Sequence, residues 1–104
     1  MPTTVRHDDH HQRFEALIDG AIAALVTYHD DGSLRSFDHT ESMGAFRGTG
    51  AATAVVRAAL DDAAATGHSV LPVCPFVARR IALEPDRYLH LVPTDQQAAF
   101  GLLP

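Results

Sequence analysis

The stretch "AFRGTGAATAVVRAAL", Ala45–Leu60, decides the fold because the hydrophobic period changes within it. Gly48 and Gly50 interrupt the chain, and a run with helical spacing follows at once. The apolar face of that run comprises Ala52, Val55, Val56, Ala59, Leu60 and Ala63. Gly67 is the expected C-terminal stop. The sequence therefore predicts a helix that starts beside Gly50 and ends before Gly67.

The glycine loop that opens this helix is a candidate anion site. Because Gly48 and Gly50 lack a Cβ, the backbone can bend tightly and bring several N–H groups to one ligand. The helix adds its positive N-terminal end, and Arg47 adds a cation that binds phosphate oxygens in a bidentate manner. A pyrophosphate fits such a site. The alternative is that the glycines only form a turn and that Arg47 is a surface charge.

Three strands are predicted before the glycine loop. Residues 13–20 alternate side chains with a period of two. Two further runs, Ile22–His29 and Leu34–Met43, flank a turn at Asp30–Ser33, where Gly32 tolerates a positive φ. These runs predict an antiparallel meander. Alanines at the start of the second run also suit a helix, which is the alternative there.

The segment after the long helix predicts one more strand and one more helix. His68–Cys74 is short and apolar, and Pro72 within it indicates a bulge or an edge position. Pro75 suits the first turn of a helix, which is predicted over "PFVARRIAL", residues 75–83. Two strands joined by a helix form a right-handed parallel crossover. We therefore expect an α/β fold of the α+β type, with a mixed, mainly antiparallel sheet, two or three helices and the order β-β-β-α-β-α.

The two ends of the chain are predicted to lie outside the domain of residues 13–93. Residues 1–12 are polar, which indicates a flexible start, and residues 94–104 are assigned to a C-terminal tail. Metal binding is the alternative for the histidines of the first segment, which are His7, His10 and His11. No further cluster of ligands supports a metal site, so a solvated segment is the favoured interpretation.

Composition limits the classes of function. The chain has 104 residues, enough for one small domain, and 46% of them are hydrophobic against 20% charged, which is typical of a globular protein. Eight basic against 13 acidic residues give a net charge of −5, which argues against nucleic acid as a partner. A single cysteine excludes an internal disulfide. Without an apolar run that could span a membrane, we expect a cytoplasmic protein with no membrane partner.

Three short motifs carry a family resemblance. "RGTGAA", residues 47–52, places Arg three residues before Gly and five before Ala; "FDHTESMGAF", residues 37–46, precedes it and "SVLPVCPFVARRI", residues 69–81, follows. Together they resemble the minimal, single-domain GNAT-like (GCN5-related) N-acetyltransferases, whose usual pattern is His-Thr-Glu-Val, Phe-x-Gly-x-Gly and Pro-x-Cys-x-Phe-Val. The resemblance covers roughly Phe14–Val92. Ser42 replaces the usual valine, and "LEPDRY", residues 83–88, replaces a His-Pro-Glu-Tyr run.

This resemblance implies acetyl-CoA as the acyl donor. In GNAT folds the strand before the glycine loop and the strand after its helix diverge, and the pantetheine arm pairs with the exposed backbone. The residues expected to contact acetyl-CoA are Ser42, Met43, Arg47, Gly48, Thr49, Gly50, Ala51 and Ala52. Backbone N–H groups around Glu41–Met43 would then stabilise the oxyanion that forms when an amine attacks the thioester.

Four side chains are candidates for proton transfer. His39 is a candidate base or proton relay, because histidine is the residue type best suited to proton transfer near neutral pH; Glu41 is a second candidate base, and Tyr88 is a candidate acid. Cys74, the only thiol, directly precedes a predicted helix start, whose positive end favours a thiolate. It is a candidate proton donor to the leaving thiolate or a candidate acyl acceptor. The alternative for His39 and Cys74 is a packed or solvated side chain without a catalytic role.

Two functions from different classes stay open after these observations. The first is an acetyl-CoA-dependent N-acyltransferase that acts on a small-molecule or protein amine, and the second is a CoA-binding module without turnover. A purely structural domain would do neither. Acidic residues such as Asp38 and Glu41 are compatible with a cationic acceptor or with a solvated surface. Because so short a chain offers little wall for an acceptor pocket, a homodimer is one expected source of that wall.

Overall fold

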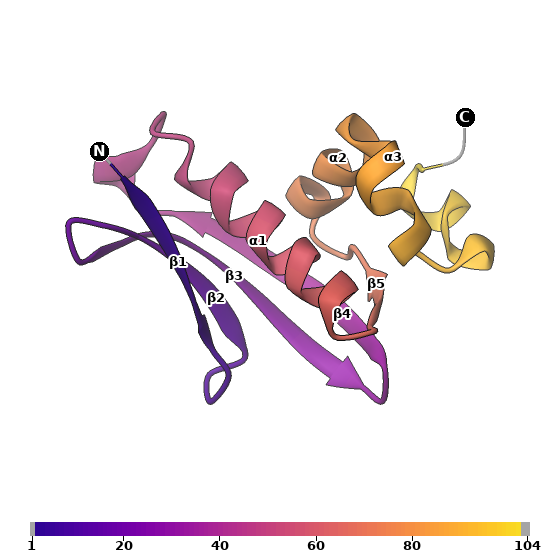
Figure 1. The fold of residues 1–104 in the computed structure, drawn as a ribbon. Coiled ribbons are helices and arrows are strands. Elements are labelled where there is room, and N and C mark those ends of the chain that lie inside the picture. The colour runs from indigo at the N-terminus through magenta and orange to yellow at the C-terminus, as the bar shows by residue number, and fades with distance from the viewer. Residues whose placement is uncertain (1, 103–104) are drawn as a thin grey trace.

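The computed structural model describes residues 2–102 as a five-stranded sheet with helices packed on one face (Figure 1). The strands follow one another across the sheet in the order β1-β2-β3-β4-β5. Their bounds are β1 Thr3–Asp8, β2 Arg13–Ile18, β3 Ala21–Asp31, β4 Leu34–Ser42 and β5 Ser69–Leu71. The helices are α1 Ala51–Ala65, α2 Pro75–Leu83 and the single turn α3 Pro85–Tyr88, with short 3-10 turns at residues 44–46, 89–91, 94–96 and 98–100. The predicted fold class is confirmed.

The antiparallel meander is confirmed in β2, β3 and β4. The alanine-rich start of β3 is a strand, because Ala23 and Ala24 are fully buried in a sheet that α1 covers. Gly32 takes φ +63° in the turn between β3 and β4, a conformation that a residue without a Cβ adopts at little cost.

The predicted flexible start is wrong for the N-terminal segment, because Thr3–Asp8 form β1 and pair with β2. Side-chain pairing across the two strands holds this polar strand in place. Glu15 of β2, whose side chain is fully buried, accepts hydrogen bonds from Arg6 of β1 and from Arg13. On the other face, the His7 ring stacks on Phe14 with 4.1 Å between centroids.

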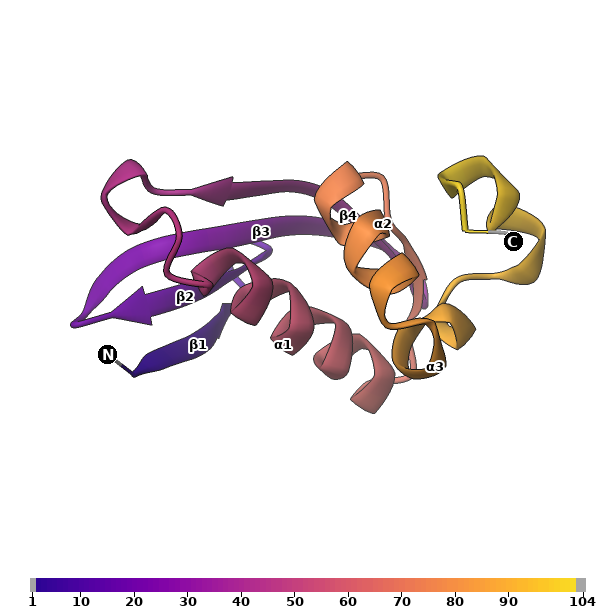
Figure 2. The same ribbon diagram turned by 90° about the horizontal axis from the view of Figure 1, so that it is seen from above.

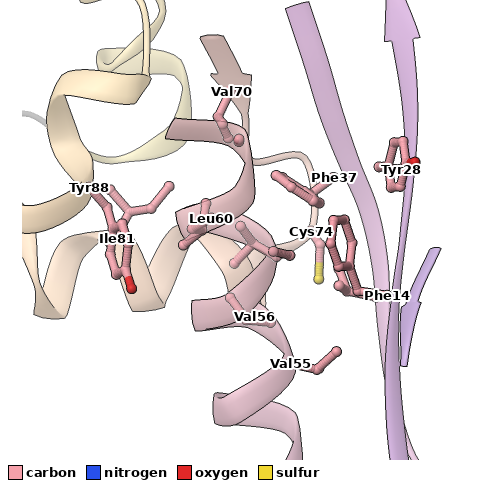
Figure 3. Close-up of a cluster of buried hydrophobic side chains, with 14 of the residues drawn as sticks. Phe14, Tyr28, Phe37, Val55, Val56, Leu60, Val70, Cys74, Ile81 and Tyr88 are labelled. Carbon is pink, nitrogen blue, oxygen red and sulfur yellow. The ribbon is translucent and has the colours of Figure 1, made fainter. Parts of the chain in front are cut away.

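Helix α1 agrees with the prediction at both ends. It begins after Gly50 and ends at Ala65, with Gly67 just beyond it at φ +75°. Its buried face contributes Val55, Val56 and Leu60 to the core between the helix and the sheet (Figure 3). In the view from above, α1 runs obliquely across the strands, and α2 lies beside it (Figure 2).

Strand β5 is shorter than the predicted seven-residue run, because it ends at Leu71, directly before Pro72. Proline has no N–H to donate to a neighbouring strand, so the parallel ladder between β4 and β5 stops there. Pro75 opens α2 as predicted, and α2 covers residues 75–83.

The C-terminal residues up to 102 lie against the domain. Two 3-10 turns, at 94–96 and 98–100, lead to Leu102, which is buried, and the Gln97 amide donates to the Val92 carbonyl at 3.1 Å. Within residues 2–102, no helix combines the length and apolar character that crossing a membrane requires.

Candidate active site

The central feature of the site is the divergence of β4 from β5. The two strands pair in parallel only from Leu34 with Ser69 to Ser36 with Leu71. One more hydrogen bond, from the Cys74 N–H to the Phe37 carbonyl at 2.9 Å, closes the apex of the divergence. Beyond it, β4 continues to Ser42 while the chain after β5 turns into α2. The backbone of β4 after Phe37 therefore has an open edge.

A bulge lies at this apex. Thr27 pairs with His39 and Tyr28 pairs with Phe37, so Asp38 has no partner on β3. A bulge of this kind re-aims side chains, and bulges are common beside active sites. Asp38 and His39 are both exposed.

The open edge offers backbone groups from alternate residues of β4. The Met43 N–H donates to the Ala23 carbonyl of β3 at 2.9 Å. Because backbone directions alternate along a strand, Ser42 and Thr40 direct their N–H and C=O groups away from β3, toward the open edge. Of the N–H groups predicted around Glu41–Met43, Ser42 is therefore the one with the right direction to bind a carbonyl oxygen there.

The glycine loop lies at the far end of this edge, directly after β4. Gly48 and Gly50 have φ values of +80° and +84°, and a Cβ built on either would meet no atom within 4 Å. These glycines are therefore required by backbone conformation, with open space on the side where a ligand would lie. Gly50 is the N-cap of α1 and has no side chain to cap the helix; the Ala51 N–H donates to the Thr49 Oγ1 at 3.4 Å, which leaves the N–H groups of the next residues for a ligand.

A groove connects the loop with the start of α2. It has a volume of about 330 Å³ and is lined by Ser42, Phe46, Gly48, Gly50, Ala51, Ala52, Thr53 and Phe76. Ser42 belongs to β4 and Phe76 to the first turn of α2, so the groove opens into the space between β4 and α2. Arg47 is exposed beside it. Of the predicted acetyl-CoA contacts, Ser42, Gly48, Gly50, Ala51 and Ala52 line this groove, and Met43, Arg47 and Thr49 do not.

Cys74 lies at the apex, on the face of the sheet that the helices cover. It is 6% exposed, belongs to the apolar core, and is the N-cap of α2 (Figure 3). Its Sγ is 3.3 Å from the Thr40 Oγ1 of β4. The only thiol of the chain therefore lies beside the open edge of β4.

Tyr88 is not brought to this apex. It lies beyond the C-terminal end of α2, whereas Cys74 lies at the N-terminal end, and α2 is nine residues long. Burial and the nearby Asp61 carboxylate raise the pKa of Tyr88 to about 12. Its hydroxyl is buried and has no hydrogen-bond partner within residues 2–102. The position fits a core residue between α1 and α3.

The histidines of the first segment lie on the β1–β2 hairpin, with His7 on β1 and with His10 and His11 side by side in the turn, 4.9 Å between their ring centroids. His7 is hydrogen-bonded through Nε2 to the Tyr28 hydroxyl at 2.5 Å, and His11 Nδ1 lies 2.8 Å from Asp8. Across residues 2–102, no three His, Cys, Asp or Glu side chains come together in a group that could hold a metal ion.

One side-chain pair at the apex was not predicted from the sequence. His29 of β3 has its Nδ1 2.7 Å from the Asp38 Oδ2 of β4, and this hydrogen bond and the carboxylate charge raise the pKa of His29. The two residues are nine positions apart, on either side of the hairpin turn. In the strand register His29 pairs with Ser36, so Asp38 lies two residues farther along β4, and neither this diagonal contact nor the bulge beside it has a signal in the sequence.

Comparisons with known proteins agree with this geometry. The model of the family described as GCN5-related N-acetyl-transferase matches residues 13–91. Among solved structures, the fold is similar to the NMR solution structure of a GCN5-like protein from Staphylococcus aureus, with a TM-score of 0.59 and 18% identity over 86% of this chain and 87% of that one. A comparison with the curated proteins finds no match. Because the family model covers most of the chain, including the open edge and the glycine loop, this protein belongs to the GCN5-related N-acetyltransferase family.

Proposed function

We propose that this protein transfers an acetyl group from acetyl-CoA to an amine. The observation that carries the proposal is the open edge of β4, which runs from the glycine loop to the apex at Phe37 and Cys74. An extended donor with a phosphate end and a thioester end suits such an edge. The phosphates would lie at one end of the edge and the thioester at the other.

The glycine loop is the proposed pyrophosphate site. Gly48 and Gly50, with positive φ, line the groove together with the start of α1, and such a loop before a helix suits the binding of phosphate oxygens by backbone N–H groups. Arg47 supplies the countercharge. From Ser42 to Asp38 the edge spans roughly 13 Å at about 3.3 Å per residue, which is comparable with the reach of an extended pantetheine arm.

At the apex, different residues of this chain would stabilise the oxyanion, protonate the leaving group and contact the acceptor. The Thr40 N–H, which faces the open edge two residues from Asp38, would stabilise negative charge on the thioester oxygen. Cys74, beside Thr40, is the proposed proton donor to the leaving CoA thiolate. His39 and Glu41 stay candidates for contact with the acceptor, since both are exposed on the stretch of β4 between the apex and the glycine loop. A second copy of the chain remains the expected source of further acceptor contacts.

The test compares CoA binding with CoA release. Calorimetric titration with CoA measures binding, and the appearance of free thiol from acetyl-CoA, with and without amines, measures transfer. We expect binding together with amine-dependent release. Binding without release for every amine would support a CoA-binding module, and neither binding nor release would contradict the proposal.

A further inference from the structure

The His29–Asp38 pair is placed to act on the acceptor amine. We propose that His29, oriented by Asp38, is the general base that removes the proton from that amine; this inference rests on the N-acyltransferase function proposed above. Three features of the molecule support this role: the place where the donor's thioester would end, the face of the sheet that is open there, and the free ring nitrogen of His29.

The thioester would end beside Asp38. The groove at the glycine loop reaches Ser42 of β4 and Phe76 of α2, and farther along β4 the Cys74 N–H donates to the Phe37 carbonyl. Asp38 directly follows Phe37 on β4, on the side of this hydrogen bond that faces the glycine loop. It is also the residue of the bulge that has no partner on β3. A donor bound along the edge therefore brings its reacting carbon close to Asp38.

Only one face of the sheet is accessible at this point. On the face that carries the helices, Phe37 is fully buried and Cys74 nearly so, and both belong to the core with Val55 and Val56. The opposite face is not covered by any helix of residues 2–102 (Figure 1). An acceptor amine must therefore approach from this open face, where His29 is 59% exposed.

The hydrogen bond with Asp38 prepares His29 for proton transfer. An ionised carboxylate only accepts hydrogen bonds, so Nδ1 of His29 carries the proton that it donates to Asp38. The Nε2 lone pair is then free, and the ring is held in one orientation. By contrast, the His39 ring has no side-chain partner that fixes its tautomer within residues 2–102, although it lies on the same stretch of β4.

The surrounding charges are those that a base for a cationic acceptor requires. The carboxylates that face His29 are Asp38 from β4 and Asp30 and Asp31 from its own strand, and together they raise the pKa of His29. The same negative charges favour an ammonium group near the ring. The groups at the apex thus attract a protonated amine and provide a base with a pKa above that of an isolated histidine.

The reaction balances with these groups alone. The ammonium group first loses a proton to bulk water, which leaves a neutral amine. The nitrogen lone pair of this amine then attacks the thioester carbon, and His29 Nε2 takes one N–H proton from the attacking nitrogen, directly or through one water. The C–S bond breaks with its electron pair on sulfur, and the thiolate takes a proton from a nearby donor or from solvent. The products are an acetylated amine and free CoA.

The test compares His29→Gln and Asp38→Asn with a matched control. The β1–β2 turn holds a second exposed pair of the same kind, His11 with Asp8 at 2.8 Å, which β3 separates from β4, so His11→Gln is the control. Rates are measured with acetyl-CoA and three probe amines, spermidine, phenethylamine and a lysine-containing peptide. CoA affinity is measured by calorimetry for each variant.

We expect His29→Gln to lower kcat by roughly 100-fold or more with CoA affinity unchanged, since a positioned base typically contributes at least that factor. Asp38→Asn removes the main cause of the raised pKa of His29. The acidic limb of the kcat/KM profile of this variant should therefore shift to lower pH. Imidazole should partly restore the rate of His29→Ala. His11→Gln should match the wild type in each of these measurements.

The outcomes separate this inference from the proposed function. If the wild type transfers acetyl groups and His29→Gln retains its kcat and pH profile, His29 is not the base although the enzyme function holds. If the wild type binds CoA but acetylates none of the amines, the proposed function fails and the base assignment fails with it.

Discussion

At the scale of single residues, the glycine loop is tested most directly by Arg47 and Gly50. Arg47→Ala should weaken CoA binding about tenfold, or ~1.4 kcal/mol, because one charge-assisted contact is lost at an exposed position. Gly50→Val should weaken it further, because its side chain would project into the open space of the proposed pyrophosphate site. Calorimetric titration measures both.

Backbone strain in Gly50→Val needs its own control, because valine disfavours positive φ. Gly67 has a similar φ, +75°, also with open space around it, but lies at the other end of α1. Gly67→Val should therefore lower stability without changing CoA affinity. Equal affinities in Arg47→Ala, Gly50→Val and the wild type would refute the loop assignment.

Cys74 is the second residue whose role can be isolated. If its thiol protonates the leaving thiolate, both Cys74→Ser and Cys74→Ala should slow CoA release, and Cys74→Ala should be the slower because it lacks any donor. Mass spectrometry after incubation with acetyl-CoA shows whether Cys74 itself accepts an acetyl group. Transfer and labelling that are unchanged in both variants, with CoA still bound, would mean that Cys74 only packs in the core.

At the scale of elements, the attachment of β1 depends on Glu15. Its fully buried carboxylate accepts hydrogen bonds from Arg6 of β1 and Arg13 of β2. Glu15→Ala should lower the free energy of unfolding by roughly 1–3 kcal/mol, because hydrogen bonds to a buried charged group are lost. Amide hydrogen exchange should accelerate most in Thr3–Asp8.

The control for this element is Glu41→Ala, which changes an exposed carboxylate on β4 of the same sheet. Urea unfolding should show a change within about 0.5 kcal/mol, as is usual for surface positions. If Glu15→Ala is as stable as Glu41→Ala and exchange in β1 is unchanged, backbone pairing alone holds β1.

At the scale of the whole molecule, Arg35 links the sheet to α1. Its side chain is 6% exposed, binds Asp30 through two hydrogen bonds of 2.8 and 2.9 Å and Asp62 of α1 at 3.2 Å, and lies 4.1 Å from the centre of the Tyr28 ring. The hydrogen bonds from Arg35 lower the pKa of Asp30 below its ordinary value. The network therefore makes stability depend on pH.

The sign follows from the lowered pKa. Asp30 is ionised more readily in the folded state than in the unfolded state. Its contribution to the free energy of unfolding is therefore complete above the ordinary aspartate pKa and is lost as pH falls through the lower pKa of the folded state. Asp30→Asn should therefore lower the free energy of unfolding by about 1–2 kcal/mol at pH 7 and by progressively less below about pH 4. Urea unfolding at several pH values measures this. A difference that stays constant down to pH 2 would exclude the ionic contribution.

The sequence by itself determined the elements whose signals are local. The change of hydrophobic period at Gly50 predicted α1, Gly67 predicted its end, and Pro75 predicted α2, because helix periodicity and termini depend on neighbouring residues in the chain. The glycine loop and the resemblance to a known family were likewise predicted from short motifs of neighbouring residues. One local signal was misread, since the polarity of Thr3–Asp8 concealed a strand that needs Glu15 and Phe14 opposite it.

Only the tertiary structure decided how the site is assembled. The sequence placed Pro72 within a strand, but the ladder ends before it and thereby opens the edge of β4. The contact between His29 and Asp38 depends on register and on a bulge between two strands, and the distance between Cys74 and Tyr88 depends on the course of α2. Register, bulges and packing angles arise from contacts between residues far apart in the chain, so no local pattern specifies them.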